Sequence, residues 1–195
     1  MRDLSNKPRD LDLIDTLESF ERVRFEGSVW RVVREGKNPV VGQRSGGRWD
    51  PGEFDVLYTS LEAKGAIAEI DFVLSSLPVR PSKVRFVLRE IAVRANKVLE
   101  FIDIERLSDL GVDMSSFARI DYQRTQEIGD AAYFLDSEGF LVPNARWQCN
   151  NLVLFTDRLT PDDLEFLKSL PVDFEEWRAE VKGTSRIRRF KKPGD

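Results

Sequence analysis

Histidine is absent from this chain of 195 residues, and cysteine occurs once, as Cys149. Without imidazole, a Ser-His-Asp triad, a Cys-His dyad and a histidine-ligated metal site are all excluded. One cysteine cannot form a thiolate zinc cluster or an internal disulfide, which fits a reducing compartment, and we expect Cys149 to be inert. We therefore expect no metal site. Any catalysis has to come from carboxylates, arginines, tyrosines or hydroxyls.

Long apolar runs are also missing. No run reaches the roughly 20 residues that a membrane-spanning helix needs. The N-terminal segment MRDLSNKPRDLDL lacks the apolar stretch of a secretory signal. We therefore expect a cytoplasmic protein with no membrane partner. The length, with 41% hydrophobic and 33% charged residues, suits one domain over residues 1–195. A net charge of −4 argues against broad nucleic-acid binding, although residues 183–195 form a basic tail.

Hydrophobic periodicity predicts helices and strands that follow one another without a regular βαβ rhythm, which favours an α+β fold. The predicted helices cover residues 11–22, the segment around Glu69, 104–110, 122–135 and a helix that begins at Thr160-Pro161. The predicted strands cover residues 27–34, 54–58, 84–93, 97–102, 140–143 and 151–156. Residues 35–53 hold five glycines and two prolines and form a long loop, which we interpret as functional.

The segment from Gly46 to Glu69 concentrates the unusual residues. A Gly-Gly turn presents Arg48 and Trp49, a short strand carries Tyr58, and a helix carries Glu69. On that helix the polar residues share one face, and Glu69 lies about 140° away from it, at roughly 100° per residue. A carboxylate on an apolar stripe is costly unless it is paired. Glu69 therefore either bonds to a buried donor or faces a cavity that holds a ligand.

Several short motifs occur in a set order and together resemble the RES-domain family. The matching stretches are Trp30-Arg31, Gly46-Gly47-Arg48-Trp49, Tyr58-Thr59-Ser60, Ala68-Glu69, Gln126-x-x-Gly129-Asp130, Val142-Pro143-Asn144-Ala145-Arg146 and Asn150-Asn151-Leu152-Val153-Leu154-Phe155. They span about residues 28–156. The helix at 11–22 and the basic tail lie outside this span.

The resemblance implies a fold like that of ADP-ribosyltransferases, with a split, curved β-sheet core flanked by helices. It implies cleavage of the nicotinamide–ribose bond of NAD+, with phosphate, water or a protein as the acceptor. NAD+ is then the substrate, inorganic phosphate is one option for a co-substrate, and no other cofactor is expected. The resemblance also implies a bacterial toxin held by an Xre-type helix-turn-helix antitoxin and allows a homodimer within that complex. From the net charge we expect no direct nucleic-acid partner.

The resemblance also assigns residues. Arg48, Tyr58 and Glu69 match the family's catalytic set, and Arg31 matches an earlier NAD-contacting arginine. Three further positions are implied to contact NAD+, namely Gly47, Trp49 and Asn144. Asn144 is a departure from the family, because many members have serine at this position of the Pro-Ser-Ala motif.

These residue types suit the implied reaction. Breaking the nicotinamide–ribose bond passes through an oxocarbenium-like state whose leaving group is already cationic, so no general acid is needed. A carboxylate such as Glu69 can stabilise the developing positive charge. Arg48 and Arg31 offer planar donors to a diphosphate, and the ring of Tyr58 can stack on nicotinamide. The amide of Gly47 can approach a phosphate closely.

Structural alternatives stay open for the same residues. Glu69 can be a buried structural carboxylate paired with Arg48 or Arg31, and Tyr58 and Trp49 can serve in packing alone. For the whole chain, the rivals to an NAD+-consuming toxin are an ADP-ribosyltransferase with a protein target, a nucleotide-binding module without turnover, and an interaction or nucleic-acid-binding protein that uses its basic tail.

Overall fold

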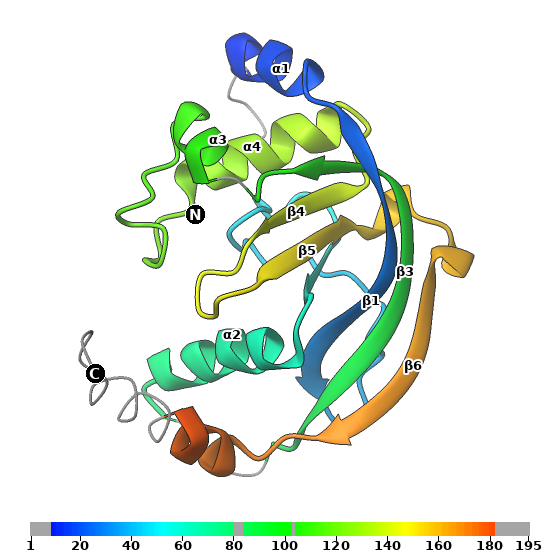
Figure 1. The fold of residues 1–195 in the computed structure, drawn as a ribbon, viewed down its shortest axis with the longest axis vertical. Helices are drawn as coiled ribbons and strands as arrows, with labels where there is room; N and C mark the ends of the chain where they lie inside the picture. The colour runs from blue at the N-terminus through cyan, green and yellow to red at the C-terminus, as the bar shows by residue number, and fades with distance from the viewer. Residues whose placement is uncertain (1–8, 80–83, 103, 182–195) are drawn as a thin grey trace, which may run out of the picture.

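The computed structural model describes residues 9–79, 84–102 and 104–181 (Figure 1). The predicted basic tail at 183–195 lies outside the described residues. In chain order the elements are α1 (Leu11–Glu18), β1 (Arg22–Arg34), β2 (Val56–Ser60), α2 (Ala63–Ser76), β3 (Phe86–Glu100), α3 (Ile104–Asp109), α4 (Gln123–Phe134), β4 (Gly139–Pro143), β5 (Asn150–Phe155) and β6 (Leu164–Pro171). Two 3₁₀ turns, Thr156–Arg158 and Pro161–Asp163, precede β6, and residues 174–181 are helical.

The six described strands form one strongly curved sheet in the order β1-β2-β5-β4-β3-β6. The two long strands β1 and β3 also pair directly with each other, antiparallel, so the sheet closes on itself. β6 pairs with the first half of β3, and β4 pairs in parallel with its last residues. Figure 1 shows β1, β3 and β6 as a tall curved wall, with β4 and β5 beside it.

Side chains alternate between the two faces of each strand, which divides the apolar residues into separate clusters. One cluster joins residues of β1, β2, β3 and β5, and a second joins the sheet to α1, α3 and α4. The third packs α2 against β1 and β3. Representative members are Val29 and Leu57 of the first cluster, Phe140 and Ile128 of the second, and Ala66 and Val32 of the third.

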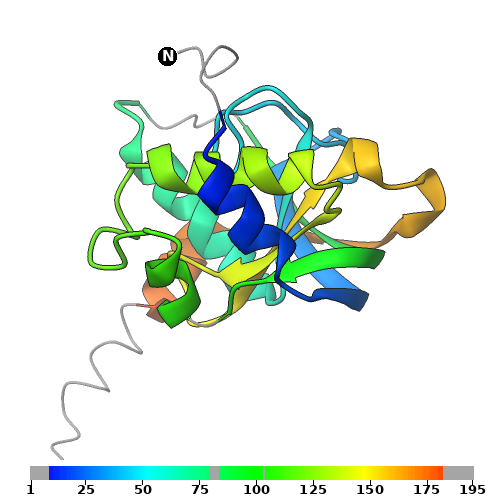
Figure 2. The ribbon, with the colours of Figure 1, turned by 90° about the horizontal axis from the view of Figure 1, so that it is seen from above.

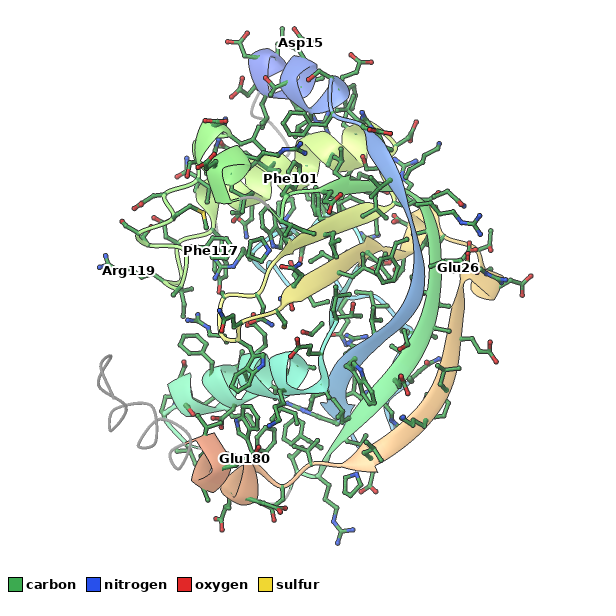
Figure 3. The ribbon with its side chains drawn as sticks, viewed as in Figure 1. Asp15, Glu26, Phe101, Phe117, Arg119 and Glu180 are labelled. Atoms are coloured by element: carbon green, nitrogen blue, oxygen red, sulfur yellow. The ribbon has the colours of Figure 1, made fainter. Side chains whose placement is uncertain are left out.

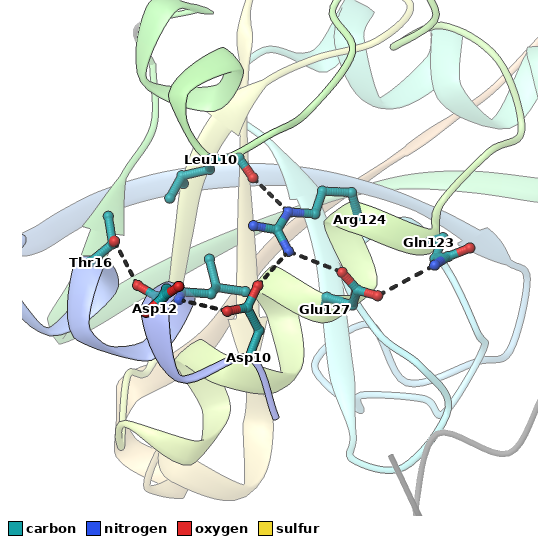
Figure 4. Close-up of polar contacts among 8 residues, drawn as sticks. Asp10, Asp12, Thr16, Leu110, Gln123, Arg124 and Glu127 are labelled. Carbon is teal, nitrogen blue, oxygen red and sulfur yellow. Dashed lines mark hydrogen bonds and ion pairs between the residues drawn. The ribbon is translucent and has the colours of Figure 1, made fainter. Parts of the chain in front are cut away.

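Helix α4 is held in place by α1, which lies against it as Figure 2 shows from above. Arg124 of α4 donates through Nε to the carbonyl oxygen of Leu110 at 2.6 Å (Figure 4). Its Nη1 lies 3.1 Å from the carboxylates of both Asp10 and Glu127. Asp10 also caps α1, because its carboxylate accepts from the amide of Leu13 at 3.2 Å. The position of α4 matters because this helix braces the candidate site.

The predicted α+β class is confirmed, as are the curved sheet and its flanking helices. The predicted helices at 11–22, around Glu69, at 104–110 and at 122–135 are present as α1, α2, α3 and α4. Across the described ranges, no helix combines the length and hydropathy required to cross a bilayer.

Two predictions about secondary structure are wrong. The strands predicted at 84–93 and 97–102 are one strand, β3, because the polar residues between them lie at exposed positions while the backbone pairing continues. The amides of Asn96 and Lys97 both bond to the carboxylate of Glu138. The helix predicted from Thr160 is a single 3₁₀ turn, because the residues that follow pair with β3 as β6.

Candidate active site

The loop that carries Arg48 is folded around the buried carboxylate of Asp50. Oδ1 of Asp50 accepts from the amides of Gly46 at 3.1 Å and Gly52 at 2.7 Å. Oδ2 accepts from the amide of Gly47 at 3.0 Å. A buried carboxylate is tolerated when its oxygens are satisfied by several donors in this way. Asp50 thus fixes the conformation of the loop and occupies the amide of Gly47, which we expected near a phosphate.

Helix α4 holds the same loop from the other side. Nε2 of Gln126 donates to the carbonyl oxygens of Gly47 at 2.9 Å and Asp50 at 3.2 Å. Three residues later, a β-carbon at Gly129 would lie 2.0 Å from the carbonyl oxygen of Trp49. The loop reaches this position only because glycine has no side chain. A spacing of three residues places Gln126 and Gly129 on one face of the helix, which explains the Gln-x-x-Gly pattern.

Tyr58 on β2 also supports this loop. Its hydroxyl accepts from the amide of Trp49 at 3.0 Å and donates to Oδ2 of Asp50 at 3.4 Å. Its ring lies against Gly47, where an added β-carbon would come within 2.6 Å of the hydroxyl oxygen. Burial raises the pKa of Tyr58 well above its usual range, and the nearby Asp50 carboxylate raises it further. The phenol is therefore protonated at neutral pH.

The guanidinium of Arg48 lies against two aromatic rings. Its central carbon is 4.4 Å from the ring centroid of Phe117 and 4.7 Å from that of Tyr122. Figure 3 shows Phe117 on the inner side of the segment that links α3 to α4, whereas Arg119 of that segment is directed outward. Within the described part of the chain, the side chain of Arg48 forms no ion pair or hydrogen bond. Cation–π contacts orient the group while its N–H donors stay available.

Charge around Arg48 also shapes the site. Burial lowers the pKa of Arg48, and the guanidinium of Arg146 lowers it further, whereas Tyr122 and Glu69 raise it. Glu69 is thus close enough to Arg48 to favour its charged form without forming an ion pair. The structure brings Arg48, Tyr58 and Glu69 into one region, built from the loop after β1, from β2 and from α2.

Glu69 is half-buried on α2 and is held by weak contacts. Its Oε1 accepts from the amide of Ala145 at 3.3 Å and from Nδ2 of Asn151 at 3.4 Å. None of the described residues donates to Oε2, and none of the described cations forms an ion pair with this carboxylate. The structural alternative, in which Glu69 pairs with Arg48 or Arg31, is therefore wrong. Oε2 can accept a hydrogen bond from a ligand.

Asn144 stands where many RES-domain members have serine, and it is buried between β4 and β5. Its Oδ1 accepts from the amides of Arg146 at 2.7 Å and Trp147 at 2.8 Å. Its Nδ2 donates to Oδ1 of Asn151 at 2.7 Å. Since Asn151 in turn contacts Glu69, Asn144 fixes both the β4–β5 loop and the amide that holds the carboxylate.

Arg31 faces a different side of the sheet. Trp30 pairs with Ser60, so both side chains lie on one face, and Tyr58 shares it because it is two residues from Ser60. Arg31 follows Trp30 and therefore lies on the opposite face. Among the described residues, no hydrogen bond or ion pair joins Arg31 to Arg48, Tyr58 or Glu69.

The side chain of Arg31 donates hydrogen bonds to two backbone carbonyl groups. Its Nη1 donates to the oxygens of Pro39 and Val41, each at 2.9 Å. Burial lowers the pKa of Arg31 to about 10. In this structure Arg31 thus supports the long loop that leads to Arg48. Trp49 is a core residue, 2% exposed, whose ring packs 5.3 Å from that of Phe140.

A cavity of about 290 Å³ opens beside Arg48, along the segment from residue 111 to residue 127. Its lining holds the carboxylates of Asp113, Asp121 and Glu127 beside the guanidinium groups of Arg48 and Arg124, and neither Tyr58 nor Glu69 lines it. The three carboxylates outnumber the two arginines, which disfavours a diphosphate, and the proposed catalytic carboxylate is not part of the lining. We therefore place the candidate site at Glu69 and Arg48 rather than in this cavity.

Sequence reasoning missed two residues that hold the site together, Asp50 and Gln126. The position of Asp50 directly after Gly-Gly-Arg-Trp was a usable signal, because aspartate in a glycine-rich turn commonly accepts from backbone amides. Gln126 lay in a matched motif without an assigned role. Its partners are carbonyl groups 76 to 80 residues away, which a local pattern does not reveal.

Comparison with known proteins gives a family match over most of the chain. The model of the RES domain matches residues 28–175, beyond the 28–156 span of the sequence motifs. The NAD(+) phosphorylases MbcT of Mycobacterium tuberculosis and Mycobacterium bovis are each 23% identical to this chain over 180 residues. Each alignment covers 87% of this chain and 97% of the relative.

A solved structure has the same fold. The crystal structure of the M. tuberculosis MbcT–MbcA toxin–antitoxin complex contains a chain that superposes with a TM-score of 0.77 at 21% identity. The superposition covers 87% of this chain and 97% of that chain.

Proposed function

This chain belongs to the RES domain family, and from that premise we propose that it is an NAD+-consuming enzyme that breaks the nicotinamide–ribose bond. The observation that carries the proposal is the half-buried carboxylate of Glu69, which has one engaged oxygen, one free oxygen and no paired cation among the described residues. The name of its relatives, NAD(+) phosphorylase, supports the choice of substrate. An NAD+ substrate is also consistent with a cytoplasmic location for this enzyme.

Each of the three residues has a role in the proposed reaction. Oε2 of Glu69 accepts from a ribose hydroxyl, and its negative charge stabilises the oxocarbenium-like transition state. Arg48 offers the N–H donors of its stacked guanidinium to phosphate oxygens. Tyr58 keeps the loop of Arg48 in place and offers its ring to the nicotinamide.

Four further residues were implied to contact NAD+, and the geometry suggests indirect roles for them. Gly47 and Trp49 shape the loop that presents Arg48. Asn144 acts through Asn151 on Glu69. Arg31 acts through the loop between β1 and β2. Direct contact of these residues with NAD+ stays a prediction.

Inorganic phosphate is the acceptor that we favour, because the relatives are named phosphorylases. Water and a protein side chain are the alternatives, and the latter would make the chain an ADP-ribosyltransferase. All three acceptors approach the same ribose carbon, so Glu69 and Arg48 serve each of them. No metal is needed, because the leaving group is already cationic.

An antitoxin partner is part of the proposal, because a related chain was solved in a toxin–antitoxin complex. An enzyme that drains NAD+ has to be held inactive until it is needed. The unpaired guanidinium of Arg48 favours an acidic or carboxylate-terminated segment of an Xre-type partner as the plug. A homodimer within such a complex is compatible with this arrangement.

Nicotinamide release tests the proposal directly. The purified protein is incubated with NAD+, with and without inorganic phosphate, and nicotinamide and the ribosyl product are measured. We expect nicotinamide to be released under both conditions, and to be released faster when phosphate is present. Absence of nicotinamide under both conditions, with no labelled protein in a lysate, would overturn the enzyme and leave a nucleotide-binding module.

A further inference from the structure

The β4–β5 loop presents a second arginine, Arg146, to the region of Glu69. Its central guanidinium carbon lies 3.3 Å from the ring centroid of Phe72 on α2. Its Nε is buried and has no hydrogen-bond partner. No ion pair involves Arg146 among the described residues. A charged N–H group that is buried without an acceptor is costly, so such a group calls for an explanation.

The neighbours of Arg146 place it beside the proposed catalytic carboxylate. Phe72 is three residues after Glu69, so the two side chains are neighbours on the surface of α2. Ala145, directly before Arg146, donates its amide to Glu69. Arg146 is also among the charges that lower the pKa of Arg48. Arg48 and Arg146 thus lie close enough for their charges to interact, and both belong to the region of Glu69.

Hydrogen bonds and ring packing hold the loop on both sides of Arg146. Asn144 bonds to the amides of Arg146 and Trp147. The ring of Trp147 packs 5.2 Å from that of Trp177, and its indole N–H donates to Glu62 at 3.3 Å. Both sides of Arg146 are thus anchored before any ligand arrives.

Two arginines and one carboxylate leave one positive charge in excess. An anion that accepts from the Nη groups of Arg146, which are not covered as its Nε is, removes the excess charge. Guanidinium groups present a planar fork of donors that matches phosphate oxygens. We propose, on the basis of the function proposed above, that Arg146 binds a phosphate group of a substrate together with Arg48. The group belongs either to the diphosphate of NAD+ or to inorganic phosphate.

Binding measurements on the purified full chain test this without requiring turnover. Inorganic phosphate and ADP, which carries the diphosphate but no nicotinamide, are titrated calorimetrically into wild type and into Arg146→Gln. The matched control is Arg158→Gln, because Arg158 also stacks on a ring, that of Tyr133 at 4.4 Å, but is paired with Asp136. We expect at least a tenfold loss of affinity for one of the two ligands in Arg146→Gln and none in Arg158→Gln.

The pattern of losses identifies the phosphate. A loss confined to inorganic phosphate assigns Arg146 to the acceptor, and a loss confined to ADP assigns it to the diphosphate. Unchanged affinities for both ligands, or failure of wild type to bind either, would overturn the assignment. If Arg146→Gln does not fold, Arg146→Lys keeps the charge but not the fork, and the same loss is expected at smaller size.

The outcome also separates this site from the proposed reaction. If wild type releases nicotinamide and the affinities are unchanged in Arg146→Gln, the proposed enzyme activity is supported and phosphate binding by Arg146 is contradicted. If phosphate binding depends on Arg146 but the protein releases no nicotinamide, the anion site is supported and the proposed enzyme activity is contradicted.

Discussion

The hydroxyl of Tyr58 lies 3.4 Å from Oδ2 of Asp50 and donates to it, which links β2 to the buried carboxylate at the centre of the Arg48 loop. The same Oδ2 accepts from Ser45 and Gly47, while Oδ1 accepts from Gly46 and Gly52. One carboxylate thus collects five donors. This network fixes the backbone that carries Arg48, whereas the cation–π contacts with Phe117 and Tyr122 orient its side chain.

Asp50→Asn should destabilise the protein, because an amide presents one acceptor where the loop needs two. In either orientation its NH₂ group faces two or three donors that lose their partner. We expect the free energy of unfolding in urea to fall by about 3 kcal/mol, and kcat/KM for NAD+ to fall with it. Asp55→Asn is the control, since Asp55 is partly exposed and forms a surface ion pair with Arg44. Equal stability of the two variants would contradict the role of Asp50.

Gly129→Ala should disrupt the contact between α4 and the loop. The added carbon would meet the carbonyl oxygen of Trp49 at 2.0 Å, and backbone atoms move only if the helix or the loop shifts. Overpacking of this kind costs roughly 1–3 kcal/mol or more. Gly27→Ala is a matched control, because the nearest atom to its β-carbon is a Phe25 ring carbon at 3.5 Å. A thermal midpoint for Gly129→Ala as high as that for Gly27→Ala would show that the loop adapts freely.

Arg31→Lys should lower stability, because an ammonium reaches the carbonyls of Pro39 and Val41 less well than a guanidinium does. We expect a loss of about 1–2 kcal/mol in the free energy of unfolding. Arg24→Lys, on the same strand but exposed and paired with Glu26, should be close to neutral. A raised KM for NAD+ with an unchanged thermal midpoint would instead favour direct contact of Arg31 with the substrate.

Local patterns predicted most elements of the fold, because the helices α1, α2 and α4 bury one face each and carry the matching periodicity. The errors arose where distant pairing decided the outcome. The proline and capping residues at Thr160 start only one turn, since pairing with β3 selects a strand for the residues that follow. In the same way, pairing with β1 keeps β3 a continuous strand across the polar residues in its middle.

The candidate site was predictable only in part. Glu69 was identifiable because a carboxylate on an apolar helix face is costly, and Arg48 because a Gly-Gly turn presents it. The supporting roles of Asp50, Gln126 and Asn144 depend on bonds to backbone groups, whose positions no side-chain pattern encodes. Arg31 shows the reverse case, because the sequence motif gave no sign that it faces away from Tyr58.

Glu69→Gln separates catalysis from structure. Glu69 has no ion pair among the described residues, so no cation loses its partner when Glu69 is neutralised. The thermal midpoint should therefore stay the same or rise. Nicotinamide release should fall by at least about two orders of magnitude, because the charge that stabilises the transition state is lost. Asp71→Asn, two residues further along α2, provides the contrast. Asp71 accepts from Nε of Arg178 at 2.7 Å, so this variant should lose about 1 kcal/mol of stability and keep its activity. A strongly lowered thermal midpoint in Glu69→Gln would indicate that the carboxylate has a structural role. Full activity at an unchanged midpoint would show that it has neither a structural nor a catalytic role.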